Sequence, residues 1–126
     1  MQSVGEWIRL HARRRPHKTA IVDDLRRLTY AELNTESDAV AAALAARGVR
    51  AGDRIGILAG ASVEWVVAYL AIVKLGAIAT GLNYRESPDG LNAMMQNVGV
   101  SLLFADTGAL AALTGESDLP EIVEVS

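Results

Sequence analysis

The sequence contains no cysteine among its 126 residues. A chain without cysteine forms neither disulfide bonds nor cysteine-ligated metal sites, so the class of small disulfide-stabilised proteins is excluded. Aromatic residues are scarce at 5%, and proline occupies only three positions. Neither charge sign dominates, because the formal net charge is −3. A nearly balanced, mildly acidic chain of this kind does not indicate a nucleic-acid-binding protein.

Two phosphate-binding motifs are also absent. The sequence has no G-x-x-x-x-G-K-[ST] loop and no G-x-G-x-x-G turn, the patterns that bring backbone N–H groups close to phosphate oxygens. Gly56 and Gly60 lie in and after a short apolar segment. We interpret both as small residues that allow close packing, not as nucleotide ligands.

Targeting and membrane signals are missing as well. The first fifteen residues lack the apolar core and the small-residue cleavage site of a secretory signal peptide. The apolar run over residues 63–80 has the hydropathy of a membrane span, but Glu64, Lys74 and Gly76 interrupt it. We favour a buried helix followed by a strand over the membrane alternative, and we expect a cytoplasmic protein without a transmembrane segment.

What is present indicates one compact α/β domain. Hydrophobic residues make up 51% of the chain, enough for a sizeable core. Capping residues and apolar periodicity predict helices that, with their caps, cover residues 3–16, 29–48, 62–76, 87–97 and 109–113. The predicted strands cover residues 19–22, 27–30, 54–58, 78–80, 101–105 and 121–125. This alternation predicts a layered, largely parallel sheet with flanking helices, with the hairpin over residues 19–30 at a sheet edge.

The helix predicted over residues 63–75 is apolar on every side, which is typical of a helix buried on more than one face. Lys74 lies near its end, where a positive charge complements the helix dipole. Gly76 follows as a left-handed C-cap.

Three motifs occur in a fixed order along the chain. They are Leu28-Thr29-Tyr30-Ala31-Glu32-Leu33, Gly52-Asp53-Arg54-Ile55 and Ala71-Ile72-Val73-Lys74-Leu75-Gly76-Ala77. In order and spacing they resemble the N-terminal region of the adenylate-forming superfamily, which includes acyl-CoA synthetases, luciferases and adenylation domains of peptide synthetases. The resemblance covers essentially the whole chain. Asn83-Tyr84-Arg85 resembles fatty acyl-CoA synthetases more than peptide-synthetase domains.

The resemblance implies that residues 1–126 are a partial N-terminal domain that ends before the phosphate-binding loop. The whole enzyme would adenylate a fatty or other carboxylic acid with ATP and magnesium and pass the acyl group to CoA or an acyl carrier protein. Both acceptors stay open, since Leu91-Asn92-Ala93-Met94-Met95 stands where some CoA-binding relatives carry a basic residue. We assign no catalytic, cofactor-binding or metal-binding residue to this chain and expect it to be inactive alone.

The other candidate residues favour structural roles. His11 and His17 lack the spacing of a metal site, and we interpret them as solvated surface histidines. Asp23 and Asp24 are adjacent in an extended segment and point to opposite faces, which favours a turn over acid–base chemistry. Asp106 is predicted to cap the following segment. A basic set is interpreted as a solvated helix face, with an anionic partner as the alternative: Arg9, Arg13, Arg14, Arg15 and Lys18.

Two alternatives from other classes remain. The first is a non-catalytic module that binds a partner or forms a homo-oligomer through exposed apolar surface, because residues outside this chain would normally cover one face of the all-round apolar helix. The second is a stand-alone Rossmann-like nucleotide binder, against which the missing glycine fingerprint counts.

Overall fold

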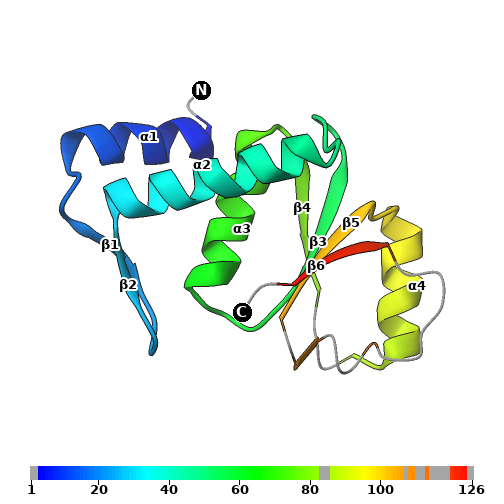
Figure 1. The fold of residues 1–126 in the computed structure, drawn as a ribbon. Coiled ribbons are helices and arrows are strands. Elements are labelled where there is room, and N and C mark those ends of the chain that lie inside the picture. The colour runs from blue at the N-terminus through cyan, green and yellow to red at the C-terminus, as the bar shows by residue number, and fades with distance from the viewer. Residues whose placement is uncertain (1–2, 83–85, 107, 110–112, 114–119, 125–126) are drawn as a thin grey trace.

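The computed structural model describes residues 3–82, 86–106, 108–109, 113 and 120–124. Figure 1 shows the helices α1 (Val4–Arg14), α2 (Tyr30–Ala46), α3 (Val63–Lys74) and α4 (Pro88–Val98). The strands are β1 (Thr19–Val22), β2 (Arg27–Thr29), β3 (Arg54–Leu58), β4 (Ile78–Gly81), β5 (Leu102–Ala105) and β6 (Glu121–Glu124). The predicted helix over residues 109–113 lies mostly outside the described residues, as does the segment 83–85.

The main sheet has four parallel strands in the order β4-β3-β5-β6. Helices α1, α2 and α3 lie on one side of this sheet and α4 lies on the other, as Figure 1 shows. This layered arrangement confirms the predicted α/β fold class.

The β1–β2 hairpin pairs antiparallel, with Thr19 opposite Thr29 and Val22 opposite Arg27. The prediction that it lies at an edge of the main sheet was wrong, because β1 and β2 form a separate two-stranded sheet. The reason is its apolar side: Leu28 is buried in a cluster with α1, α2 and α3, and Ile21 packs against that cluster. The hairpin therefore extends the helical layer.

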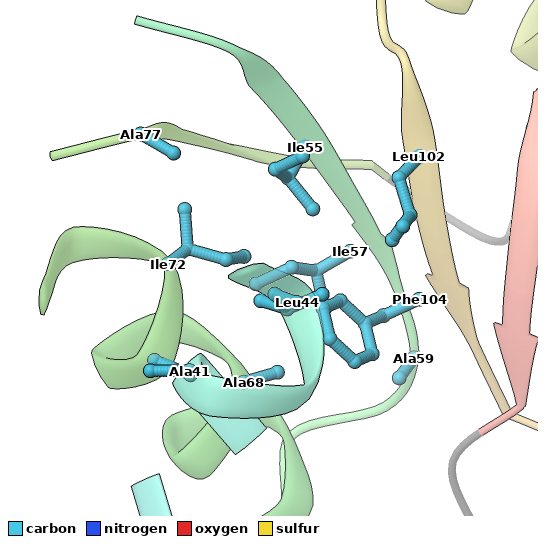
Figure 2. Close-up of a cluster of buried hydrophobic side chains, with 11 residues drawn as sticks. Ala41, Leu44, Ile55, Ile57, Ala59, Ala68, Ile72, Ala77, Leu102 and Phe104 are labelled. Carbon is cyan, nitrogen blue, oxygen red and sulfur yellow. The ribbon is translucent and has the colours of Figure 1, made fainter. Parts of the chain in front are cut away.

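Side chains of the central strands alternate between two cores, as the pleat of a strand requires. Ile55, Ile57, Leu102 and Phe104 point to the side of α2 and α3, where Figure 2 shows them meeting Leu44. On the opposite face a second cluster joins strand residues to α4; it contains Leu58, Leu103, Ala105, Leu91 and Met95. Two buried faces explain why β3 and β5 read as almost continuous apolar runs.

Helix α3 is covered on both sides by this chain. Ala71 and Ile72 pack toward the main sheet, whereas Val67 and Leu70 pack toward α1, α2 and the hairpin. The expectation that one apolar face of this helix is exposed was wrong, because α1 and α2 supply the second cover. Of the described residues, the large exposed hydrophobic side chains all lie on other elements: Val4, Trp7, Val22, Leu25, Ile78 and Met94.

The predicted caps are confirmed at the helix starts. Ser3 and Thr29 both complete capping boxes, with Glu6 and Glu32 respectively, and Ser62 and Ser87 accept hydrogen bonds from the first turns of α3 and α4. Left-handed glycines follow α3 and α4, at Gly76 and Gly99. Within the described ranges, no helix has the length and apolar character needed to cross a bilayer.

Candidate functional site

Open parallel sheets bind ligands outside the carboxyl ends of their strands, at the point where the strand order reverses direction. Here β3 leads to β4 on one side, while β5 leads to β6 on the other. The reversal therefore lies between β3 and β5. A cavity of about 180 Å³ opens at this point, and we call it the carboxyl-edge crevice; its lining residues are Asp23, Leu25, Ala59, Gly60, Ala61, Ser62, Glu64 and Asp106.

Asp106 joins the two loops that form the crevice. Its Oδ1 accepts a hydrogen bond from the backbone N–H of Ala109 at 2.8 Å, which confirms the predicted capping role. Its Oδ2 accepts a second bond from the backbone N–H of Gly60 at 3.1 Å, across 46 residues. This second bond left no local signal in the sequence.

The two glycines of the β3 region play different roles. A Cβ on Gly56 would approach Leu103 Cδ1 to 3.0 Å and Leu82 Cδ1 to 3.2 Å, so the close-packing interpretation is confirmed there. A Cβ on Gly60 would meet no atom within 4 Å. Close packing is therefore the wrong explanation for Gly60, whose N–H donates to Asp106 and whose carbonyl oxygen accepts from Ser62 Oγ at 3.1 Å.

Asp23 forms the predicted turn and also reaches a distant helix. Its Oδ1 accepts from the backbone N–H groups of Leu25 and Arg26 at 2.8 and 2.9 Å. Its Oδ2 accepts from the N–H of Val63, the first residue of α3, at 2.8 Å. These backbone donors, Val63 foremost, lower the pKa of the Asp23 carboxyl. The hairpin is thereby fastened to the positive end of the α3 dipole.

Arg26 balances the carboxylates beside the crevice. Its Nε lies 2.9 Å from Glu64 Oε1, and its Nη1 donates to Glu36 Oε1 at 3.0 Å. Burial opposes the charged form of Arg26, but Glu36 and then Glu64 outweigh it and raise the pKa of the guanidinium. Hairpin, α2 and α3 are thus linked by one cation.

The residues that line the carboxyl-edge crevice do not fit a nucleoside triphosphate. Three carboxylates line the crevice, at Asp23, Glu64 and Asp106, and they would repel phosphate oxygens. Asp23 and Asp106 already accept hydrogen bonds from backbone N–H groups, and Glu64 forms an ion pair with Arg26. Among the described residues, no group of three His, Asp or Glu side chains is placed to hold a metal ion. The contacts of the crevice hold loops in place.

Lys74 lies in the last turn of α3, as predicted, and its side-chain partners were not predicted from the sequence. Its side chain is only 1% exposed, and it crosses to α2. The Nζ donates to the carbonyl oxygen and Oδ1 of Asn34 at 3.2 and 2.8 Å, and to Ser37 Oγ and Asp38 Oδ1 at 2.8 Å each. The one available signal was Ser37, a polar residue within the apolar stripe of α2.

The predictions for the two histidines and for the basic set have different outcomes. His17 is exposed as predicted, but His11 is only half-exposed and stacks on Tyr30, with ring centroids 5.1 Å apart. The solvated interpretation of His11 was wrong because Trp7, one helical turn earlier, also packs on it at 4.2 Å. The basic set is exposed throughout, as a solvated face requires: Arg9, Arg13, Arg14, Arg15 and Lys18.

A profile of the AMP-binding enzyme family matches residues 8–126. The chain belongs to this family. It is 35% identical over 111 residues to a 3-hydroxybenzoate–CoA/4-hydroxybenzoate–CoA ligase of Thauera aromatica, covering 86% of this chain and 21% of that protein. It is 40% identical over 86 residues to a medium/long-chain-fatty-acid–CoA ligase of Mycobacterium tuberculosis, covering 68% and 14% respectively.

A solved member of the family has the same fold. The inhibitor-bound N-terminal domain of FACL13 from Mycobacterium tuberculosis superposes with a TM-score of 0.89 at 25% identity, over 99% of this chain and 34% of that one. The resemblance read from the three sequence motifs is thus confirmed. This AMP-binding family chain spans about a fifth or less of the length of the two ligases it matches.

Proposed function

We propose that this chain is a structural N-terminal portion of an ATP-dependent acyl-CoA synthetase. The whole enzyme activates a carboxylic acid as its adenylate and then transfers the acyl group to a thiol. Family membership supports this proposal, as do relatives that are CoA ligases for hydroxybenzoates and for fatty acids. Residues 1–126 form part of the large N-terminal domain and end before the phosphate-binding loop.

The observation that carries the proposal is where the structure places the side chains of the family motifs. Leu28 is buried among the helices, Thr29 caps α2, and Lys74 is enclosed by α2. None of these motif side chains lines the carboxyl-edge crevice. The motif residues therefore build the frame of the domain.

ATP, magnesium, CoA or an acyl carrier protein, and the carboxylic acid belong in this proposal to the whole enzyme. The carboxylate-lined crevice supports that assignment, since it is unsuited to a triphosphate. We place the enzyme in the cytoplasm, where its nucleotide and thiol substrates are available.

A chimeric enzyme tests the proposal. Residues 8–126 replace the aligned segment of the Thauera aromatica ligase, and acid-dependent release of pyrophosphate from ATP is measured with a series of carboxylic acids. If residues 8–126 have a structural role, the chimera remains active and keeps the acid preference of the Thauera aromatica ligase. The isolated 126-residue chain then releases no pyrophosphate. A folded chimera with a changed acid preference contradicts the structural role, as does acid-dependent release by the isolated chain.

A second candidate is a self-associating module. Since α3 is covered, its support now comes from exposed apolar side chains on α1 and the hairpin, namely Val4, Trp7, Val22 and Leu25. Light scattering measures the mass of the isolated chain in solution. A concentration-independent monomer eliminates this candidate and leaves the synthetase proposal intact.

A further inference from the structure

A groove of about 540 Å³ lies between the first two helices, and none of its lining residues lines the carboxyl-edge crevice. Its lining consists of Arg9, Ala12 and Arg13 from α1, and Ala31, Asn34 and Thr35 from α2. We call it the α1–α2 groove. Its volume falls in the range of small-molecule sites.

The groove presents hydrogen-bond donors. Arg9 and Arg13 are four residues apart on α1, so their side chains share one face of the helix. Arg9 Nη1 lies 3.9 Å from where a Cβ on Gly5 would stand, on the same side as Lys74. This placement keeps the guanidinium close to the junction of the helices.

Asn34 adds a donor that the buried lysine orients. Its Oδ1 accepts from Lys74 Nζ at 2.8 Å, so the amide oxygen is committed to α3. The Nδ2 group, with two N–H donors, is the end left for other partners. Thr35 is exposed and contributes a hydroxyl beside it.

The carboxylates of α2 near the groove have other partners within the chain. The six lining residues include no carboxylate. Glu32 and Glu36 line a neighbouring depression that shares Ala31 and Thr35 with the groove. Glu32 accepts from the backbone N–H of Thr29, Glu36 binds Arg26 and Asp38 binds Lys74.

The two arginines of the groove differ from these carboxylates in their ion pairing. Over the part of the chain that the structure describes, neither Arg9 nor Arg13 forms an ion pair. Two guanidinium groups, an amide and a hydroxyl thus line one groove, and the two guanidinium groups are not paired with a carboxylate of the described residues.

We propose that the α1–α2 groove binds the phosphate or pyrophosphate group of a small molecule. Guanidinium forks bind such oxyanions through paired, charge-assisted hydrogen bonds. The proposal goes beyond the synthetase function, which assigns no ligand to this chain. A broad polyanion, such as an anionic membrane or a nucleic acid, would contact the cations in the groove together with the exposed cations outside it: Arg14, Arg15 and Lys18.

Calorimetric titration of the 126-residue chain with inorganic pyrophosphate at low ionic strength tests the site. The wild-type chain binds one pyrophosphate saturably, and added salt weakens the binding. The double variant Arg9→Gln/Arg13→Gln loses about tenfold or more in affinity, because it removes both guanidinium groups that would hold the oxyanion. The matched control Arg14→Gln/Arg15→Gln carries the same charge change outside the groove and keeps the wild-type affinity.

A further variant guards against a folding defect. Thr35→Glu places a carboxylate in the groove at an exposed position of α2, where it occupies the donors and also abolishes pyrophosphate binding. Far-UV circular dichroism confirms that each variant is folded. The proposal is overturned if the wild type shows no saturable binding, or if Arg14→Gln/Arg15→Gln weakens it as much as the groove pair does. Retained binding by Thr35→Glu overturns it too.

Discussion

Lys74 of α3 donates two hydrogen bonds to Asn34 of α2, one to the side-chain oxygen at 2.8 Å and one to the backbone carbonyl at 3.2 Å. Ser37 and Asp38 complete the coordination of the ammonium group. Gly5 of α1 lies over the lysine stem, where a Cβ would come within 3.2 Å of Lys74 Cγ. One side chain therefore fixes the meeting point of three helices.

Replacing this lysine tests its structural role. Lys74→Met removes the ammonium group that donates to the buried Ser37 Oγ and to Asn34 Oδ1. We expect the free energy of unfolding to fall by about 2–4 kcal/mol, the range for breaking a buried charge network. Urea unfolding measures the change. Lys18→Met, at an exposed position, serves as the control, and equal effects of the two substitutions would argue against the role of Lys74.

The glycine pair of the β3 region offers a matched comparison. Gly56→Ala introduces a methyl group against Leu103 and Leu82, and we expect a loss of about 1–3 kcal/mol because a packed core resists extra volume. Gly60→Ala enters open space and changes stability by less than about 0.5 kcal/mol. Thermal unfolding of both variants measures the difference. Similar midpoints would show that the sheet adjusts freely at Gly56.

The carboxylate of Asp23 makes the free energy of unfolding depend on pH. Its pKa is lowered in the folded chain, so its contribution is complete above the pKa of an unfolded aspartate and is lost as the pH falls through the folded pKa. Asp23→Asn removes this dependence and lowers stability at neutral pH. Urea midpoints measured from neutral to strongly acidic pH test the expectation. Asp24→Asn, whose carboxyl lies outside this network, keeps the wild-type acid profile.

Asp106 holds the two loops of the carboxyl-edge crevice together. Asp106→Ala removes the acceptor for Gly60 and Ala109, and we expect a loss of about 1 kcal/mol, the usual cost of losing a capping side chain. Hydrogen exchange at the amide of Gly60 is the more direct measurement, because that N–H loses its partner. Unchanged exchange of this amide would contradict the described link.

Local rules were sufficient for the elements of this fold. Ser3 and Thr29 cap their helices through side chains three residues away, and Gly76 and Gly99 end helices by adopting left-handed backbone angles. These interactions connect residues within a few positions, so their partners are visible in the sequence. The order of the family motifs likewise identified the family from the sequence alone.

Long-range contacts were beyond those rules. His11 was expected in solvent, yet it packs on Tyr30, and the hairpin was expected at a sheet edge, yet it covers the helices. Asp23 meets Val63 across 40 residues. In each case the tertiary packing determines which residue is the partner. Apolar periodicity in the sequence predicts that a residue is buried, but it does not predict which residue it packs against.

The sequence by itself determined the α/β class, the positions of the helix caps and membership of the AMP-binding family, because each depends on residues close together in the chain or on motifs in a fixed order. Only the tertiary structure decided that α3 is covered on both faces, that Lys74 is bound by α2 and that Arg9 and Arg13 share a groove with Asn34. Those outcomes depend on which helix faces meet, and that is set by the packing of the whole domain.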